Sequence, residues 1–190
     1  GRSTYKNIEI IVVDNASTDD TPTLVARDFP DVTVLVNDGN IGFAAGNNVG
    51  IHRALEMGAD YVFVLNNDTL VAADLFEQML TVADANPSIG AVAPMIYYVD
   101  KPEQVWSSGG RRHPVTYEKT GDLAGTRYAY QYTEPVAQDY FTGCAILLRR
   151  EMLDEIGAFD ERFFFTYEDS DLCFRAREAG FILMLSLIHI

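Results

Sequence analysis

Three consecutive units, each an apolar strand followed by a polar turn and a helical segment, constrain the fold of this chain most strongly. The strands are continuous apolar runs rich in β-branched residues, which is typical of strands buried on both faces. They are predicted at Ile8–Val13, Val32–Val36 and Tyr61–Leu65. The helices are predicted around Leu24, from about Ala44 to Met57, and from about Ala72 to Ala85. This alternation predicts an α/β domain with a mostly parallel sheet and helices on both faces.

Polar clusters follow two of these strands directly. Asp14–Asp19 comes after the first strand, and Asn66–Asp68 after the third. Right-handed crossovers bring the carboxyl ends of parallel strands to one edge of the sheet, where open α/β sheets bind their ligands. We therefore expect both clusters at a functional edge.

The second half of the chain is less regular. Residues 97–140 mix Pro, Gly, Tyr and charged residues without a clear period, and we expect short strands that cover the substrate side. A strand is predicted at Phe141–Leu148, a short helix at Glu151–Ile156, and a further helix that ends at Gly180. The apolar run 181–190 has the pattern of a buried strand, and the alternatives at a terminus are truncation and non-native sequence.

Composition excludes several functional classes. The formal net charge of −14 argues against a nucleic-acid partner, which requires a basic face. It does not exclude a phosphate-bearing ligand, because a divalent cation can bridge acidic side chains to phosphates. The two cysteines do not form a disulfide framework, so a reducing cytoplasm is the simpler reading. No run approaches the ~18 apolar residues of a membrane-spanning helix.

Asp68 is the first candidate for chemistry. A carboxylate at a strand end can hold Mg²⁺ or Mn²⁺ against a diphosphate, because hard cations prefer oxygen ligands. The alternative is an acid that caps the next helix.

Asp14 and the segment Asn40–Asn48 are candidates for the donor side. The Asp14 carboxylate could accept a hydrogen bond from a uracil or thymine N–H, or form a turn with Asn15 and Ser17. The second segment is rich in Gly and Asn, so its backbone could approach a ligand closely at a helix N-terminus. A tightly packed helix start explains it equally well.

The acidic patch Glu168, Asp169 and Asp171 lies beside aromatic residues, Phe163–Phe165 and Tyr167. Acids in a first helical turn gain from the helix dipole, which is the simpler explanation. Aromatic side chains can also exclude water, and a carboxylate in that setting can act as a general base.

An ordered set of segments resembles the family-2 glycosyltransferases, especially their bacterial rhamnosyltransferase-like branch. The set spans about residues 8–181 and consists of residues 9–19 (EIIVVDNASTD), 40–48 (NIGFAAGNN), 65–69 (LNNDT), 142–145 (TGCA) and 157–172 (GAFDERFFFTYEDSDL). Each segment alone is weakly specific, whereas the ordered set is highly specific.

The resemblance implies a GT-A (Rossmann-like) fold, a nucleoside-diphosphate sugar donor, a Mg²⁺ or Mn²⁺ ion, and transfer with inversion. It places Asp68 on the metal-binding acid and Asp169 on the catalytic base, with Glu168 as the partner of that base. The first acid of the metal motif is Asn66 here. Donor binding is assigned to Asp14, Asn40, Gly42, Asn47 and Asn67. The acceptor side is assigned to Thr142, Gly143, Cys144 and Asp171.

The same comparison predicts the domain organisation. We expect residues 1–184 to form an incomplete GT-A catalytic domain whose first strand is missing, and residues 185–190 to be a non-native tail. A domain without that strand should bind donor weakly and turn over poorly.

The leading hypothesis is a hexosyltransferase, with rhamnose as one candidate sugar, that uses a dTDP- or UDP-sugar and a saccharide or lipid-linked acceptor. It would act in the synthesis of cell-envelope polysaccharide or glycolipid, in the cytoplasm or at the inner face of the membrane, with peripheral membrane contact. The alternatives are a sugar nucleotidylyltransferase and a non-catalytic module that binds nucleotide sugars.

Overall fold

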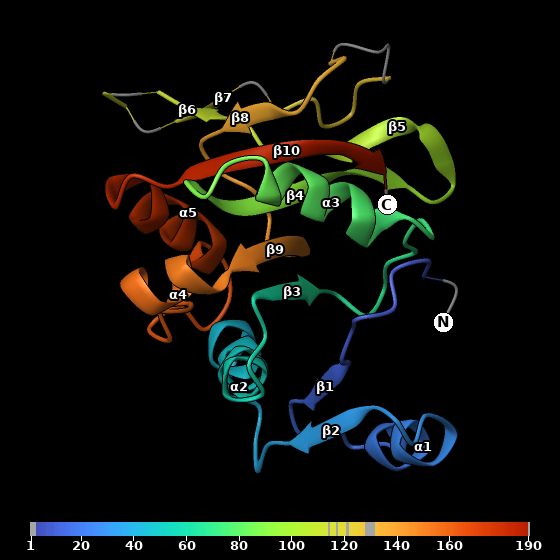
Figure 1. Ribbon diagram of the computed structural model, residues 1–190. Coiled ribbons are helices and arrows are strands. Elements are labelled where there is room, and N and C mark those ends of the chain that lie inside the picture. The colour runs from blue at the N-terminus through green and yellow to red at the C-terminus, as the bar shows by residue number, and fades with distance from the viewer. Residues whose placement is uncertain (1–2, 114, 117, 121, 128–131, 190) are drawn as a thin grey trace.

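The computed structural model describes residues 3–113, 115–116, 118–120, 122–127 and 132–189. Fifteen helices and strands are assigned within these ranges (Figure 1). The helices are α1 (Thr21–Asp28), α2 (Phe43–Glu56), α3 (Leu75–Asp84), α4 (Arg150–Ile156) and α5 (Glu168–Glu178). The strands are β1 (Ile11–Asp14), β2 (Thr33–Val36), β3 (Tyr61–Leu65), β4 (Ile89–Tyr98), β5 (Lys101–Ser107), β6 (Arg111–Arg112), β7 (Lys119–Thr120), β8 (Val136–Gln138), β9 (Ala145–Arg149) and β10 (Ile182–His189).

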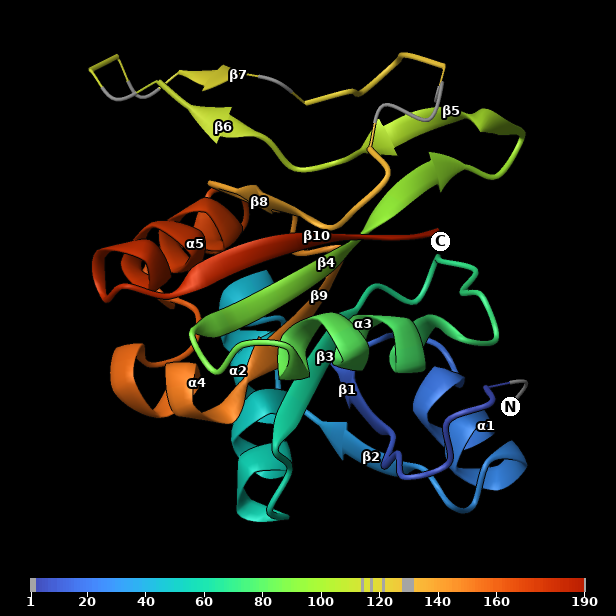
Figure 2. The same ribbon diagram turned by 45° about the horizontal axis from the view of Figure 1, so that its top comes forward.

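A six-stranded mixed sheet forms the centre of the molecule. Its order is β3-β9-β4-β10-β8, and β5 pairs with β4. Strands β1 and β2 form a separate parallel pair, and β6 and β7 a small antiparallel pair. In Figure 2 the β6–β7 pair lies beyond β8 and β5, on the opposite side of the sheet from β1 and β2.

Alternate residues along the central strands belong to two separate cores. Val62 and Val64 of β3 pack in the core that includes α2, α4 and α5, whereas Phe63 packs against the core that includes α3. The same alternation holds in β9, where Leu147 belongs to the α3 core. Because side chains alternate across a strand, the sheet buries both faces under helices. The predicted α/β architecture with helices on both faces is therefore confirmed.

The prediction of a mostly parallel sheet is wrong. β4 and β10 are parallel, but β9 runs antiparallel to both β3 and β4, and β8 is antiparallel to β10. The physical reason is the direction from which β9 enters the sheet. The chain returns from residues 97–140 at the carboxyl end of β3, where Asn66 N donates to Cys144 O at 2.8 Å, so β9 must run back along β3.

Two segments differ from their sequence-based expectations. The longest strand, β4, was not predicted, although Ile89–Ile96 is a nearly continuous apolar run that follows Pro87. The terminal apolar run forms β10, with Leu183 and Leu185 almost fully buried. Residues 185–189 thus continue a strand of the central sheet, and their non-native origin stays a prediction.

Candidate active site

The side chain of Asn15 joins the end of β1 to the start of α2. Its Nδ2 donates to Asn40 Oδ1 at 3.1 Å and to the Gly42 carbonyl oxygen at 3.0 Å. Its Oδ1 accepts from the Ile41 backbone N–H at 3.2 Å and from Asn37 Nδ2 at 3.1 Å. Asn15 was predicted only as a turn residue, yet it holds together the edge to which donor binding was assigned.

Asp14 lies buried at the end of β1, with 6% of its surface exposed. Its Oδ2 accepts the Ser17 backbone N–H at 3.0 Å, which is the turn expected from the sequence as the alternative to a base contact. The carboxylate has a second oxygen, so the turn does not conflict with a base contact, which stays a prediction.

The start of α2 is fixed against the loop that precedes α5. The Phe43 N–H donates to the Phe164 carbonyl oxygen at 2.7 Å. Gly42 precedes it with φ of 89° and ψ of 174°, a conformation essentially reserved for glycine. A Cβ on Gly42 would lie 2.5 Å from that same carbonyl oxygen. Gly42 therefore allows the two segments to touch.

The turn Thr142–Cys144 contacts Asp169 and the end of β3 that precedes Asp68. Gly143 N donates to Asp169 Oδ2 at 3.2 Å, and Cys144 O accepts the N–H of Asn66, two residues before Asp68. A Cβ on Gly143 would lie 3.2 Å from the Phe43 ring. This turn thereby joins the end of β3, the start of α2 and the start of α5 in one region.

Asp68 follows β3 as an exposed residue. Within the described ranges its carboxylate has no hydrogen-bond or ion-pair partner, and no group of three His, Cys, Asp or Glu side chains that could hold a metal ion is found there. An exposed carboxylate without a protein partner still fits Mg²⁺ or Mn²⁺, since these ions are often bound by one or two carboxylates together with substrate phosphates and waters.

Cys144 lies close enough to Asp68 to be affected by its charge. Burial raises the pKa of the Cys144 thiol, and the negative charge of Asp68 raises it further, to about 11. Only the thiolate is a strong nucleophile, so this cysteine is poorly reactive near neutral pH. This environment is that of a packed thiol rather than of a nucleophile.

The raised pKa gives a direct prediction for thiol labelling. At pH 8, Cys144 should react with iodoacetamide about 100-fold more slowly than a thiol of pKa 9, because each pKa unit changes the thiolate fraction tenfold. Replacing Asp68 by asparagine should speed the labelling of Cys144, because it removes the negative charge that helps to raise the pKa of the thiol. Site-resolved mass spectrometry separates Cys144 from buried Cys173. Rapid labelling of Cys144 in the protein without substitutions at pH 8 would contradict the raised pKa of this thiol.

Glu168 and Asp169 occupy the first turn of α5, with Glu168 buried at 5% exposure and Asp169 half-buried. Asp169 Oδ2 accepts from Gly143, and Asp169 Oδ1 accepts the Ser170 hydroxyl at 3.1 Å. These hydrogen bonds fix the orientation of the Asp169 carboxylate at the start of α5. An oriented, partly exposed carboxylate is suited to accept a proton from a bound hydroxyl.

The remaining predicted residues occupy varied positions. Asp171 Oδ2 accepts from Arg175 Nε at 2.7 Å, so this acid lies in an ion pair. Asn47 donates to the Phe43 carbonyl oxygen within α2. Its neighbour Asn48 is buried and exchanges hydrogen bonds with the backbone of Phe159. Asn67 is exposed beside Asp68. Contacts with donor or acceptor for Asn47, Asn67 and Asp171 stay predictions.

Comparison with known proteins follows the same segments. Residues 2–157 match the family model described as "Glycosyl transferase family 2". The chain belongs to glycosyltransferase family 2. The match includes the β1, α2, β3 and β9 contributions to the site and ends before α5.

Individual relatives agree with this family assignment. The chain is 27% identical over 199 residues to N-acetylglucosaminyl-diphospho-decaprenol L-rhamnosyltransferase of Mycobacterium tuberculosis, covering 95% of this chain and 64% of that protein. The chain thus spans less than two thirds of that relative's length.

Two solved structures share the fold of this family-2 chain. GalNAc-T7, solved with UDP, GalNAc and Mn²⁺, gives a TM-score of 0.68 at 14% identity, covering 96% of this chain and 38% of that chain. Mannosyltransferase PcManGT from Pyrobaculum calidifontis, in complex with GDP-Man and Mn²⁺, gives 0.65 at 18% identity, covering 100% of this chain and 50% of that chain. Both are glycosyltransferases of GT-A fold, so the predicted GT-A fold is confirmed.

Among the residues that the structure describes, no helix has the length and apolar character that a membrane span requires.

Proposed function

We propose that the protein is an inverting glycosyltransferase that moves a sugar from a nucleoside-diphosphate sugar to a hydroxyl acceptor. The turn Thr142–Cys144 carries this proposal, because it touches Asp169 on one side and the strand end that precedes Asp68 on the other. Inverting transfer needs a base at the acceptor and stabilisation of the leaving diphosphate, and these two acids can supply the two functions. Membership of family 2 supports the same reaction.

Asp169 is the proposed general base. Its carboxylate takes the proton of the acceptor hydroxyl as that oxygen forms a bond to the anomeric carbon. The bond from the anomeric carbon to the diphosphate breaks at the same time, and the electron pair leaves on the diphosphate. Gly143 N–H and the Ser170 hydroxyl keep the carboxylate oriented during this step. Glu168, buried beside it, is the proposed positioning partner.

Asp68 is the proposed ligand of a divalent cation. Such an ion, when bound, neutralises charge that develops on the departing diphosphate. The proposed donor side consists of Asp14, Asn40, Gly42, Asn47 and Asn67. The network around Asn15 supports this placement, because it holds Asn40 and Gly42 at the end of β1. The Mn²⁺ present in both structural neighbours supports a divalent cation here without choosing between Mg²⁺ and Mn²⁺.

The proposed substrates follow from the relatives. The mycobacterial relative is named as an N-acetylglucosaminyl-diphospho-decaprenol L-rhamnosyltransferase, which favours a saccharide or lipid-linked acceptor. A dTDP- or UDP-sugar is the proposed donor. The proposed acceptor side consists of Thr142, Gly143, Cys144 and Asp171. The corresponding setting is the synthesis of cell-envelope polysaccharide or glycolipid, in the cytoplasm or at the inner face of the membrane.

A donor-binding experiment tests this proposal and separates it from a non-catalytic module. With saturating UDP-sugar or dTDP-sugar and Mn²⁺, the melting temperature should rise by about 5–10 °C, since a ligand at 100 times its Kd adds ~2.7 kcal/mol to a domain of this size. Asp68→Asn should remove the part of this rise that depends on Mn²⁺. Differential scanning fluorimetry with a panel of donors measures both.

The control is Asp154→Asn, which makes the same chemical change on the exposed face of α4. It should leave the donor-induced rise unchanged. A rise that is equal with Mn²⁺ and with EDTA, and insensitive to Asp68→Asn, would contradict the metal assignment. Donor binding without transfer or hydrolysis favours the binding module, whereas release of pyrophosphate from a nucleoside triphosphate and a sugar phosphate favours a nucleotidylyltransferase.

A further inference from the structure

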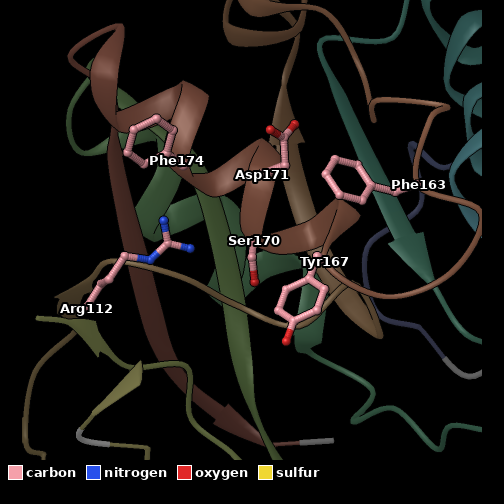
Figure 3. A pocket seen from close by; sticks show the side chains of 6 residues that line it. All are labelled: Arg112, Phe163, Tyr167, Ser170, Asp171 and Phe174. Carbon is pink, nitrogen blue, oxygen red and sulfur yellow. The ribbon is translucent and has the colours of Figure 1, made fainter. Parts of the chain in front are cut away.

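A pocket of about 400 Å³ lies along α5 (Figure 3). Three aromatic side chains and one arginine dominate its lining. The lining residues are Arg112, Phe163, Tyr167, Ser170, Asp171 and Phe174. This volume is within the range of small-ligand sites. None of the family segments identified in the sequence contains Arg112, which belongs to the short strand β6.

Ser170 connects the pocket to the proposed base. Its side chain lines the pocket, and its hydroxyl donates to Asp169 Oδ1 at 3.1 Å. Figure 3 shows Ser170 between Tyr167 and Arg112. A molecule in this pocket therefore lies beside the carboxylate that would accept its proton.

The cationic end of the pocket is not neutralised by its neighbours. The Arg112 backbone N–H donates to Asp139 Oδ2 at 2.8 Å, while the guanidinium groups of Arg111 and Arg177 lie 3.8 Å and 3.2 Å from Asp139 Oδ1. One carboxylate is thus shared by two other arginines. Within the described ranges no carboxylate lies within 4.0 Å of the Arg112 guanidinium, which instead lies 5.6 Å from the Phe174 ring centroid.

Asp171 does not oppose an anion at this end, because it is paired with Arg175, whose guanidinium also donates to the carbonyl oxygens of Ile156 and Ala158. An unpaired guanidinium offers a planar set of donors that matches phosphate and carboxylate groups. In a chain of net charge −14, this surplus of positive charge favours an anionic ligand group.

The aromatic end is held by a strained backbone. Thr166 and Tyr167 have φ of 80° and 76°, a conformation that is an outlier for a β-branched residue such as threonine. Tyr167 remains 63% exposed at the pocket. Such strain commonly marks a functional position. Flat aromatic surfaces of this kind pack well against the apolar face of a sugar ring.

We propose that this pocket binds the acceptor saccharide, with Tyr167 and Phe163 against its ring and Arg112 bound to an anionic group about one sugar ring from the reacting hydroxyl. Phe174 follows Asp169 by five positions, a rise of about 7.5 Å along α5, which matches that separation. The anionic group is a phosphate or a carboxylate on the acceptor. The inference rests on the proposed transferase function and names its acceptor class.

Binding of small probes tests the pocket without requiring turnover. Glucose 1-phosphate, glucuronate, methyl glucoside and inorganic phosphate are titrated separately by ligand-observed NMR. Arg112→Gln should weaken binding of one or both anionic sugars at least tenfold and leave methyl glucoside unchanged, and Tyr167→Ala should weaken all three sugars. The anionic sugar that responds identifies phosphate or carboxylate. Arg111→Gln, which removes a neighbouring charge of the same kind outside the pocket lining, should have a much smaller effect.

Three outcomes would overturn the inference. In the first, Arg112→Gln weakens the binding of charged and neutral sugars equally. In the second, it changes the binding of none of the probes. In the third, inorganic phosphate binds as tightly as the sugar phosphate. Donor binding, measured in parallel by thermal shift with Mn²⁺, keeps the two proposals distinguishable. If the protein binds no donor but binds the anionic sugar in a way that depends on Arg112, only the transferase function is contradicted. In turnover assays Arg112→Gln should raise the acceptor KM and leave the donor KM unchanged.

Discussion

Replacing Asp169 by asparagine should lower the rate of sugar transfer by about 10²–10⁴-fold, the usual contribution of a general base, while donor binding is retained. The asparagine side-chain oxygen can still accept a hydrogen bond from Gly143 N–H, so the turn and α5 should keep their arrangement. Loss of the negative charge at the start of α5 should cost only about 0.3–1 kcal/mol of stability. Initial rates and donor-induced thermal shifts of the same preparation measure the two effects.

Asp154→Asn is again the matched control and should leave transfer unchanged. The informative comparison is between the turnover number and the donor affinity of Asp169→Asn. If both fall together with the melting temperature, Asp169 is a structural acid that holds the turn Thr142–Cys144 against α5, and the general-base assignment is wrong. Glutamate at this position keeps the charge but moves it by one methylene, so partial activity of Asp169→Glu would favour the chemical role.

The local elements of the fold could be predicted from sequence because their signals are local. β3 was predicted with its observed bounds, and α2 within one residue at each end, since apolar periodicity and Gly58 define them. Strand pairing is different, because it depends on partners far apart in the chain. Nothing within the β9 sequence states that it pairs between β3 and β4 and runs antiparallel to both, so the sheet was predicted as mostly parallel.

The same distinction applies to the candidate site. Asp68 and the acidic patch that contains Asp169 could be selected because they stand at the end of a strand and the start of a helix. The family resemblance then assigned the metal to Asp68 and the base to Asp169. Arg112 could not be selected, because it reaches α5 through the irregular region 97–140, whose sequence shows no period. Asn15 has a conventional turn sequence, and its four hydrogen bonds to the segment around Asn40 become visible only when β1 and α2 are placed together.

Gly42→Ala should destabilise the protein by about 2–4 kcal/mol and lower its melting temperature by about 5–15 °C. Two separate causes contribute. The backbone at Gly42 has φ of 89°, which an alanine adopts only with strain. Its new Cβ would also lie 2.5 Å from the Phe164 carbonyl oxygen, so either α2 or the loop before α5 must move. Thermal and urea unfolding measure the loss.

A series of three glycines separates these causes. Gly58 has a similar φ of 88°, but a Cβ there meets nothing within 4 Å, so Gly58→Ala reports backbone strain alone, about 1–2 kcal/mol. Gly39 has open space without positive φ, and Gly39→Ala should be neutral or slightly stabilising. The excess loss in Gly42→Ala over Gly58→Ala then measures the contact between α2 and the α5 loop. Because that contact places the Asn40–Phe43 segment beside the Asp169 region, Gly42→Ala should also weaken donor binding, whereas Gly58→Ala should not. Equal destabilisation of the Gly42 and Gly58 variants, with donor binding intact in both, would mean that the contact contributes nothing to assembling the site.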